Sequence, residues 1–360
     1  MNGLLQWGVV RPRGTHASIA VRRGDDVLCL RPLAEAGLLG HDPDLLHAVC
    51  EPVLNALIEL GRPAWRLLER RLREVIDDGH ALLPLAFCDE LLPVRITDYV
   101  DFYASLEHVE NFGRIWRPGQ PAVHENWRHM PVGCHGRAST VMVSGTPVRR
   151  PRGQVAPGEM APTRALDLEC EVGFVCGPTV RGPIAVDDAD AHLFGVVLVN
   201  DWSARDIQRL EYVPLGPFLG KSFATSMSAW ITPLDALPRA TPREQDFAPA
   251  EYLRARAPWA LDIALEIEVD GEVLSRPRSS WLYWTPAQMV AHLTINGATL
   301  TAGDLFATGT VSGSEPGTEG SLGEIGRGER WLADGDEVVL RGRVGEIELG
   351  EVRGRVLTAK

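Results

Sequence analysis

Short apolar runs separated by glycine and proline make up most of the chain after about residue 90. The clearest of them are TVMVSG, LDLECEVGFVCG, FGVVLVND, LDIALEIEVDG, DEVVLRGRVG and GEIELGEVRGRVL. Runs of this length that are rich in valine, isoleucine and leucine and bounded by turn residues are typical of β-strands. The pattern therefore predicts a mostly β domain over residues 91–360. One helix interrupts it, with Thr285 as N-cap, Pro286 at the first helical position and Gly297 beyond its end.

The first 90 residues have a different pattern and predict a small domain of their own, residues 1–90. Residues 17–30 predict two short strands joined by a turn at Arg-Gly-Asp-Asp. Asp42 and Pro43 then indicate the N-cap and the first position of a helix that Pro52 is placed to split. A further helix is predicted from Pro63 to Gly79.

Composition narrows the class of protein. A chain of 360 residues, 45% of them hydrophobic, is long enough for two domains with substantial cores. Its formal net charge is −12, and its basic residues form no stripe, so we expect no nucleic-acid partner. The acidic excess fits either simple solubility or a carboxylate site for a cation.

The cysteines and the apolar runs indicate where the chain resides. Its six cysteines form no CxxC pair and no zinc-type spacing, so we expect reduced thiols. We find neither a signal-peptide pattern at the N-terminus nor about 18 consecutive apolar residues anywhere. The sequence therefore predicts a cytoplasmic protein with no membrane partner.

Two glutamates alternate with apolar residues in LDLECEVGF (166–174). As a strand, this segment places Glu169 and Glu171 on one face with their side chains about 7 Å apart. One interpretation is a solvated strand face. The other is a buried strand, in which unpaired carboxylates have raised pKa values or need a cation. The flanking apolar residues favour burial.

Two further charged residues sit next to apolar segments. VLVNDWSARDIQ (197–208) brings Asp201 to the end of a predicted strand, where active-site residues often project. The alternative is that Asp201 or Ser203 caps a helix starting at Ala204. Lys221 lies in the glycine- and proline-rich EYVPLGPFLGKSF (211–223), where it either meets a carboxylate or anion or snorkels to the surface.

DYVDFYASLEH (98–108) brings Asp101, Tyr103 and His108 together in sequence. A lone histidine is more often structural than catalytic, and nothing local distinguishes His108 from the other nine. The residues taken alone predict an acidic metal site and assign no reaction to it.

Six segments resemble the fumarylacetoacetase family in their order and in much of their spacing. They are DYVDFYASLEH (98–108), NW-H-PVG-HGRAS (126–139), VSGTPVRRPRGQ (143–154), LDLECEVGF (166–174), FGVVLVNDWSARDIQRLEYVPLGPFLGKSFAT (194–225) and GDLFATGTVSG (303–313). The resemblance covers essentially the whole chain. It implies a mainly β fold with some α-helix, in which a small SH3-like N-terminal domain precedes a β-roll catalytic domain. It also implies a homodimer.

The resemblance implies a divalent cation as cofactor. Its ligands fall on four carboxylates, Asp101, Glu169, Glu171 and Asp201, with Lys221 and Thr225 near the metal or a second cation. Four converging carboxylates in a buried site need a compensating cation. All-oxygen ligation favours Ca²⁺ or Mg²⁺ over zinc.

The resemblance also implies roles in catalysis and binding. His108 would be the general base and Glu324 the group that orients it. An oxyanion site would consist of Arg205, Gln208 and Lys221. The substrate would be contacted by Tyr103, Arg117, Cys134, Gln208, Tyr212 and Thr310. The family usually has tyrosine where this chain has Cys134, and the chain is shorter than the family in its surface loops.

The implied activity is metal-dependent hydrolysis of a carbon–carbon bond in a small diketo acid. 4-Fumarylacetoacetate and water would give fumarate and acetoacetate, a step in tyrosine, phenylalanine and other aromatic catabolism. The metal would act as a Lewis acid on the leaving enolate. Alternatives are an acylpyruvate hydrolase, decarboxylase or isomerase acting on another oxo acid, and a non-catalytic binding protein. The HGRAS and NDWSARDIQ blocks, with His108 and Glu324, favour the hydrolase.

Overall fold

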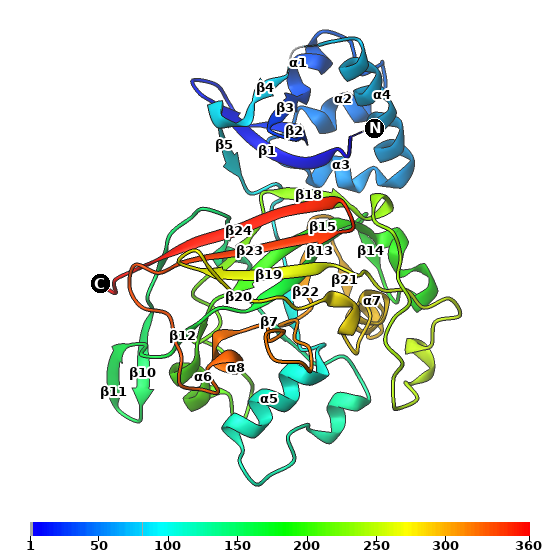
Figure 1. Cartoon of the computed structure of the whole chain (residues 1–360). Coiled ribbons are helices and arrows are strands. Elements are labelled where there is room, and N and C mark those ends of the chain that lie inside the picture. The colour runs from blue at the N-terminus through cyan, green and yellow to red at the C-terminus, as the bar shows by residue number, and fades with distance from the viewer. Residues whose placement is uncertain (1–2, 81) are drawn as a thin grey trace.

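The computed structural model describes residues 3–80 and 82–360. It is mainly β with some helix, as predicted. Figure 1 shows a smaller N-terminal lobe above a larger lobe built on packed sheets. No helix in the described residues has the length and apolar character needed to cross a membrane.

The N-terminal lobe begins with three antiparallel strands, β1 (Gln6–Pro12), β2 (Ser18–Arg23) and β3 (Asp26–Cys29). The predicted turn joins β2 to β3, with Gly24 at φ 66°, a conformation that glycine adopts without a Cβ penalty. The short strands β4 (Leu83–Pro84) and β5 (Cys88–Leu91) extend this sheet by pairing with β3 and β1.

Four helices cover one side of these strands (Figure 1): α1 (Leu30–Glu35), α2 (Pro43–Val49), α3 (Asn55–Glu59) and α4 (Gly61–Asp77). Asp42 caps α2 by accepting from two backbone N–H groups, and a break containing Pro52 separates α2 from α3, as predicted. The predicted start of α4 at Pro63 was wrong by two residues. A proline is tolerated there because the first N–H groups of a helix have no intrahelical partner.

One long sheet runs through both lobes. Its order is β4-β3-β2-β1-β18-β15-β13-β22-β6-β7, so β1 of the first lobe pairs directly with β18 of the second. The strands of the larger lobe are β18 (Trp230–Pro233), β15 (Leu193–Asp201), β13 (Cys170–Cys176), β22 (Leu305–Ala307), β6 (Tyr99–Phe102) and β7 (Gly133–His135). Strands β17 (Thr225–Met227) and β8 (Val141–Val143) join beside β15. The division at residue 90 stays a prediction.

A five-stranded sheet packs against the long one (Figure 1). Its order is β20 (Glu272–Ser275), β19 (Ala264–Val269), β23 (Glu337–Val344), β24 (Ile347–Leu357) and β9 (Val148–Arg149). The two sheets approach closely at Gly342, where an added Cβ would lie 2.8 Å from the side chain of Leu198 in β15. The main apolar core fills the space between them.

The remaining elements flank these sheets. They are the helices α5 (Leu106–Trp116), α6 (Arg205–Glu211), α7 (Pro286–Thr294) and α8 (Leu322–Ile325), and the strands β10 (Arg152–Ala156), β11 (Glu159–Pro162), β12 (Leu166–Asp167), β14 (Val180–Arg181), β16 (Ser203–Ala204) and β21 (Thr299–Leu300). Helix α7 begins as predicted, because Thr285 forms a reciprocal capping box with Gln288.

The segment 166–174 is not one continuous strand as predicted. Asp167 in β12 pairs with Ser203 in β16, and Glu169 forms a bridge with Ser321, before β13 begins at Cys170. The chain thus changes strand partners between residues 167 and 170.

Candidate active site

Four buried carboxylates converge beside the strands β15, β13, β22 and β6 of the long sheet: Asp101, Glu169, Glu171 and Asp201. One oxygen of each lies within 4.8 Å of the others, and none of the four side chains is more than slightly exposed. Strand order explains the meeting. Asp101 on β6 pairs with Ala307 on β22, β22 pairs with β13, and β13 pairs with β15, which ends at Asp201. The solvated-face interpretation of Glu169 and Glu171 was wrong.

Lys221 places its ammonium group among these carboxylates. Its Nζ contacts Glu169, lies 2.6 Å from Asp201 Oδ2 and 3.7 Å from Asp101 Oδ2. Only 11% of its side chain is exposed and its ammonium group is paired with carboxylates, so the alternative of a snorkelling surface lysine was wrong. Burial lowers the pKa of Lys221, although the nearby carboxylates oppose that shift. Thr225 Oγ1 donates to Asp201 Oδ1 at 2.9 Å, so it also borders the cluster.

The cluster remains strongly acidic despite this lysine. If all four carboxylates were ionised, the one ammonium would leave three negative charges, and Arg205 shares its single charge between Glu169 and Asp167. Burial, followed by repulsion from Asp101, raises the pKa of Glu171 and of Asp201 well above their usual values. Both carboxylate oxygens of Glu171 and Oδ1 of Asp101 are buried and accept no hydrogen bond from the described residues. These unpartnered oxygens fit a hard divalent cation.

Asp201 has no capping role. It ends β15, and α6 begins at Arg205, with Ala204 at the N-cap and no side-chain hydrogen bond to the cap. The alternative that Asp201 or Ser203 starts this helix was therefore wrong. Ser203 Oγ instead contacts Glu169 Oε2 at 3.1 Å.

A histidine–carboxylate pair adjoins the cluster. His108 on α5 has Nδ1 2.7 Å from Glu324 Oε2, and its Nε2 lies 3.5 Å from Glu169 Oε1. Burial alone would raise the pKa of Glu324, but the attraction and hydrogen bond of His108, together with hydrogen bonds from Asn111 and Ser321, outweigh burial, and the pKa falls to about 2. Three neutral side chains also donate to Glu324 at 2.9–3.0 Å: Asn111, Ser312 and Ser321. The carboxylate therefore holds the ring with Nε2 toward the acidic cluster.

Arg205 is held on several sides. Its Nε donates to Asp167 at 2.8 Å, its Nη2 to Glu169 at 2.6 Å and its Nη1 to Gln208 at 3.1 Å. The guanidinium also lies 4.2 Å from the ring centroid of Phe112. It is 4% exposed, so its charge acts in a medium that screens it weakly.

A cavity of about 270 Å³ reaches the cluster from the side of β7. It is bordered by Asp101, Asp201, Lys221 and Cys134, and by Tyr99, His135, Gly136, Arg137, Pro217, Phe218 and Ser222. Cys134 on β7 pairs directly with Asp101 on β6. Burial, followed by repulsion from Asp101, raises the pKa of the Cys134 thiol to about 12. Cys134 is thus a neutral group beside the carboxylates.

Comparison with known proteins decides which family this site belongs to. The model described as "Fumarylacetoacetate (FAA) hydrolase C-terminal" matches residues 98–357, and "Fumarylacetoacetase N-terminal" matches residues 5–87. The chain belongs to the fumarylacetoacetate hydrolase family. Fumarylacetoacetase from Homo sapiens is 40% identical over 99% of this chain and 95% of its own length. The enzyme of the same name from Oryza sativa subsp. japonica is 40% identical over 99% and 94%.

Solved structures show the same fold at lower identity. Fumarylacetoacetate hydrolase from the psychrophile Exiguobacterium antarcticum matches with a TM-score of 0.65 at 19% identity, covering 99% of this chain and 100% of that one. Maleylpyruvate hydrolase from Sphingobium sp. SYK-6, in complex with manganese(II) ion and pyruvate, matches with a TM-score of 0.61 at 18% identity and the same coverage.

The other residues carried over from the family resemblance lie on the side of α5 and α6. The ring of Tyr103 is 5.2 Å from His108, and Tyr212, just after α6, is 5.5 Å from Trp116. Arg117 is the C-cap residue that follows α5, and Thr310 is buried. The 270 Å³ cavity does not reach these residues or the catalytic histidine. Its lining, among the described residues, includes none of Tyr103, Arg117, Gln208, Tyr212, Thr310 and His108.

Asp167 is a site residue that sequence reasoning missed. It is fully buried, binds Arg205 and accepts from the backbone N–H groups of Leu322 and Gly323, just before Glu324. It thus connects the arginine to the helix that carries Glu324. The signal was present in LDLECE, where Asp167 continues the alternation of Glu169 and Glu171.

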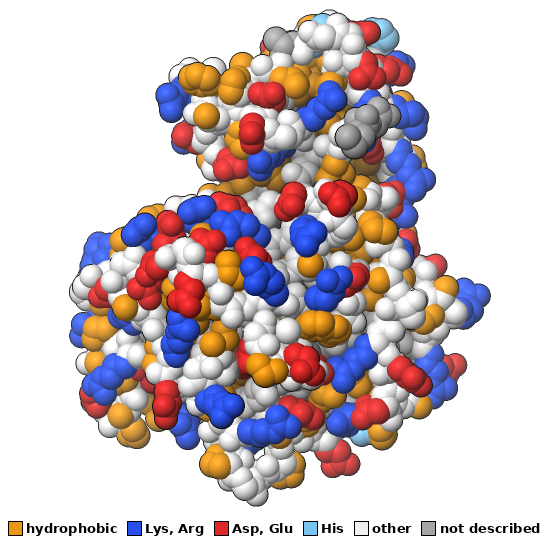
Figure 2. Space-filling model, viewed as in Figure 1, with side chains coloured by type: hydrophobic (Ala, Val, Ile, Leu, Met, Phe, Trp, Pro, Cys, Tyr) orange, Lys and Arg blue, Asp and Glu red, His pale blue; other side chains and the backbone are white. Residues whose placement is uncertain are grey.

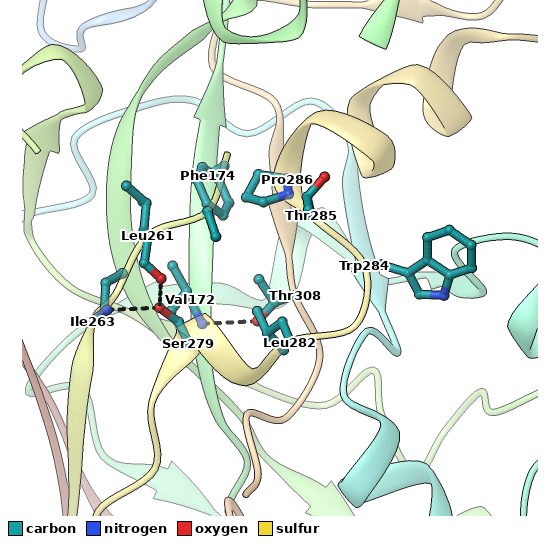
Figure 3. Close-up of a pocket in the computed structure, with 11 residues that line it drawn as sticks. Val172, Phe174, Leu261, Ile263, Ser279, Leu282, Trp284, Thr285, Pro286 and Thr308 are labelled. Atoms are coloured by element: carbon teal, nitrogen blue, oxygen red, sulfur yellow. Dashed lines mark hydrogen bonds between the residues drawn. The ribbon is translucent and has the colours of Figure 1, made fainter. Parts of the chain in front are cut away.

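A second, much smaller cavity lies behind β13 (Figure 3). It holds about 10 Å³, at most one water molecule, among Val172, Phe174, Leu261, Leu282 and other mostly apolar side chains. Ser279 there accepts from Ile263 N and donates to Leu261 O, so its hydroxyl is used within the fold. Among the described residues, no carboxylate lines this space, and we interpret it as a packing void behind the strand that carries Glu171.

Proposed function

We propose that this chain hydrolyses 4-fumarylacetoacetate with water to fumarate and acetoacetate. As a member of its family, the chain is a hydrolase of carbon–carbon bonds. The observation that carries the proposal is the His108–Glu324 pair, whose free imidazole nitrogen faces the buried carboxylate cluster at 3.5 Å. The pair supplies a base at the edge of a site that fits a divalent cation.

His108 would take a proton from the attacking water at Nε2. The water oxygen bonds to the ketone carbon, and the carbon–carbon bond then breaks with its electron pair on the acetoacetate carbon, which regains a proton. Glu324 stabilises the imidazolium that forms, because it remains ionised across the working pH range. A positioned base of this kind generally contributes roughly 10²–10⁴-fold in rate.

Arg205, Gln208 and Lys221 would stabilise the alkoxide formed by water attack. Arginine has five N–H donors, and the three contacts of Arg205 leave others for a ligand. A donor fixed before the reaction needs no reorganisation, and such a donor is generally worth roughly 10²–10³-fold.

The four carboxylates would hold the divalent cation, with Thr225 and Lys221 beside it. We propose Ca²⁺ or Mg²⁺, because all the ligand atoms are hard oxygens. When bound, the cation supplies a Lewis acid that stabilises negative charge on the diketone oxygens.

We assign substrate contacts to Tyr103, Arg117, Tyr212, Thr310 and Cys134. Two of them retain unused polar atoms: Nε of Arg117 and Oγ1 of Thr310 are buried without a hydrogen-bond partner in the described part of the chain. Arginine suits a substrate carboxylate because its planar fork binds both oxygens.

The small Cys134 side chain supports a second candidate substrate, another acylpyruvate-type oxo acid with more bulk at that end. The deciding experiment compares product formation from fumarylacetoacetate and from simpler and bulkier acylpyruvates. Fumarate and acetoacetate as the fastest products would support the first proposal. No cleavage of any diketo acid would contradict both.

We further propose that the enzyme works as a homodimer in the cytoplasm. The loop after α6 exposes Val213, Leu215, Phe218 and Leu219, with Leu215 97% exposed, and Phe218 also lines the 270 Å³ cavity. Apolar side chains grouped beside an active site often mark an interface. Light scattering on the wild type and on Leu215→Glu tests this: a dimer that the substitution dissociates supports the proposal, and a wild-type monomer contradicts it.

A further inference from the structure

Glu169 is the carboxylate at which the residues of the candidate site meet. Its side chain contacts Arg205 and Lys221, and its Oε1 lies 3.5 Å from His108 Nε2. On the face of the molecule that Figure 2 shows, acidic and basic side chains are interspersed. Glu169 is buried, so contacts within the protein set its position. The backbone around Glu169 therefore decides where the base, the oxyanion donors and the carboxylate cluster come together.

The backbone N–H of Glu169 lies where the chain changes strand partners, and it donates to a side chain. Asp201 N donates to the carbonyl oxygen of Glu169 at 3.2 Å, which continues the antiparallel pairing of β13 with β15. In the other direction, Glu169 N donates to Asn200 Oδ1 at 3.0 Å. The carbonyl oxygen of Asp201 accepts from Ser203 Oγ, also at 3.0 Å. One amide side chain thus supplies the acceptor for Glu169 N–H at this break in the sheet.

Asn200 uses only its acceptor. It precedes Asp201 on β15 and is 1% exposed. Successive side chains of a strand point to opposite faces, so Asn200 points away from the face on which Asp201 joins the cluster. Its Nδ2 is buried and has no hydrogen-bond partner in the described part of the chain. A buried donor without a partner lowers stability, so the oxygen that accepts from Glu169 N is the useful half of this amide.

We propose that Asn200 is a positioning residue for the metal site. By accepting from Glu169 N, it holds the Glu169 carboxylate beside Asp201, and it acts through Glu169 and not on the cation itself. This inference rests on the proposed function, because it takes the four carboxylates to be ligands of a divalent cation. Two adjacent residues of β15 then determine the geometry of the site, Asp201 as a ligand and Asn200 by holding a second ligand.

The test is calorimetric titration of the metal-free, full-length protein with Mg²⁺ and with Ca²⁺. Asn200→Leu keeps a similar volume but offers no acceptor. We expect it to bind the cation roughly 10–100-fold more weakly, the usual effect of losing a residue that orients a metal ligand. Asn200→Ala carries the same expectation and replaces Asn200→Leu if that variant does not fold. Asn200→Asp retains an acceptor for Glu169 N and should bind the cation at least as tightly as wild type.

Ser228→Ala is the matched control, with thermal unfolding measured on every variant. Ser228 is buried, and its Oγ accepts from Leu198 N at 3.1 Å. Like Asn200, it holds a backbone N–H with a side-chain oxygen, but at a residue outside the carboxylate cluster. Ser228→Ala should lower Tm and bind the cation with wild-type affinity.

The outcomes separate this inference from the proposed function. Wild-type cation affinity in folded Asn200→Leu or Asn200→Ala overturns the positioning role and leaves the metal assignment intact. An equal loss of affinity in Ser228→Ala also overturns it, because lower stability alone would then account for the effect. If the wild type binds neither cation, the metal assignment falls and this inference falls with it.

Discussion

His108 Nδ1 lies 2.7 Å from Glu324 Oε2, and both side chains are almost completely shielded from solvent. A buried carboxylate at this distance fixes the orientation of the ring and stabilises its protonated form. The second nitrogen is then directed toward Glu169, 3.5 Å away. Nothing in this arrangement requires the histidine to bind the metal.

His108→Ala should therefore lose roughly 10²–10⁴-fold in kcat and keep its fold and metal content. Glu324→Gln should be impaired less, because an amide still accepts a hydrogen bond from the ring. Steady-state kinetics with metal analysis of each purified variant measures both effects. Loss of the bound metal from His108→Ala would make His108 a ligand, and another group would then have to serve as base.

Glu324 also predicts how acid affects stability. Its pKa is about 2 in the folded protein against an ordinary value of 4.5, so its contribution is complete above pH 4.5 and is lost as pH falls toward 2. A depression of this size corresponds to about 3 kcal/mol. The stability difference between wild type and Glu324→Gln, measured by urea unfolding, should shrink across that window. A constant difference from pH 6 to pH 2 would show that Glu324 titrates normally.

Removing the metal should abolish turnover and lower Tm, because Asp101, Glu169, Glu171 and Asp201 then repel one another inside the protein. Adding Mg²⁺ or Ca²⁺ should restore both properties. The measurement is thermal unfolding and turnover before and after exhaustive chelation, with Asp89→Asn, which alters a surface ion pair, as control. Full activity of rigorously metal-free protein would contradict the metal assignment.

Local signals in the sequence predicted part of the fold well. The starts of α2 and α7 followed from Asp42-Pro43 and Thr285-Pro286, because a cap acts on residues within one turn. The break between β12 and β13 could not be predicted, because it depends on the bridge from Glu169 to Ser321, about 150 residues away. Distant pairings of this kind leave no local pattern.

The candidate site was predictable to a similar extent. Spacing placed Glu169 beside Glu171, but Asp101 joins them only through the order of β6, β22 and β13. His108 and Glu324 are 216 residues apart, so only the family resemblance paired them. Asp167 continues the alternation of Glu169 and Glu171, so its place on that face was predictable, but its pairing with Arg205, 38 residues away, forms only on folding.

Asp167→Asn tests this missed residue. The amide oxygen should still accept from Leu322 N and Gly323 N, so we expect the fold and metal content to be kept. Arg205 loses one of its two carboxylate partners and should shift toward Glu169. We expect this shift to lower kcat by roughly tenfold. This loss is smaller than the roughly 10²–10³-fold loss expected when an oxyanion donor is removed. The control is Asp206→Asn, which changes the residue next to Arg205 on α6. Unchanged kcat in Asp167→Asn would show that Glu169 and Gln208 suffice to hold Arg205.

Cys134 is the position at which the chain departs from its family at the cavity wall. The residue lies beside Asp101 and borders the 270 Å³ cavity with Lys221 and Phe218. A tyrosine here could donate a phenolic hydrogen bond and close one side of the cavity, whereas cysteine is smaller and a weak donor. The missing neutral hydrogen bond should weaken fumarylacetoacetate binding by roughly tenfold at most.

Cys134→Tyr should therefore raise kcat/KM for fumarylacetoacetate and lower it for bulkier acylpyruvates, without changing metal content. Cys134→Ser is the matched control, because it keeps the small volume and should change neither preference by more than a few-fold. The measurement is kcat/KM of the three proteins on both substrate classes. If Cys134→Tyr leaves both values unchanged, the side chain at position 134 does not shape the substrate pocket, and the pocket is formed instead by the residues beside α5 and α6.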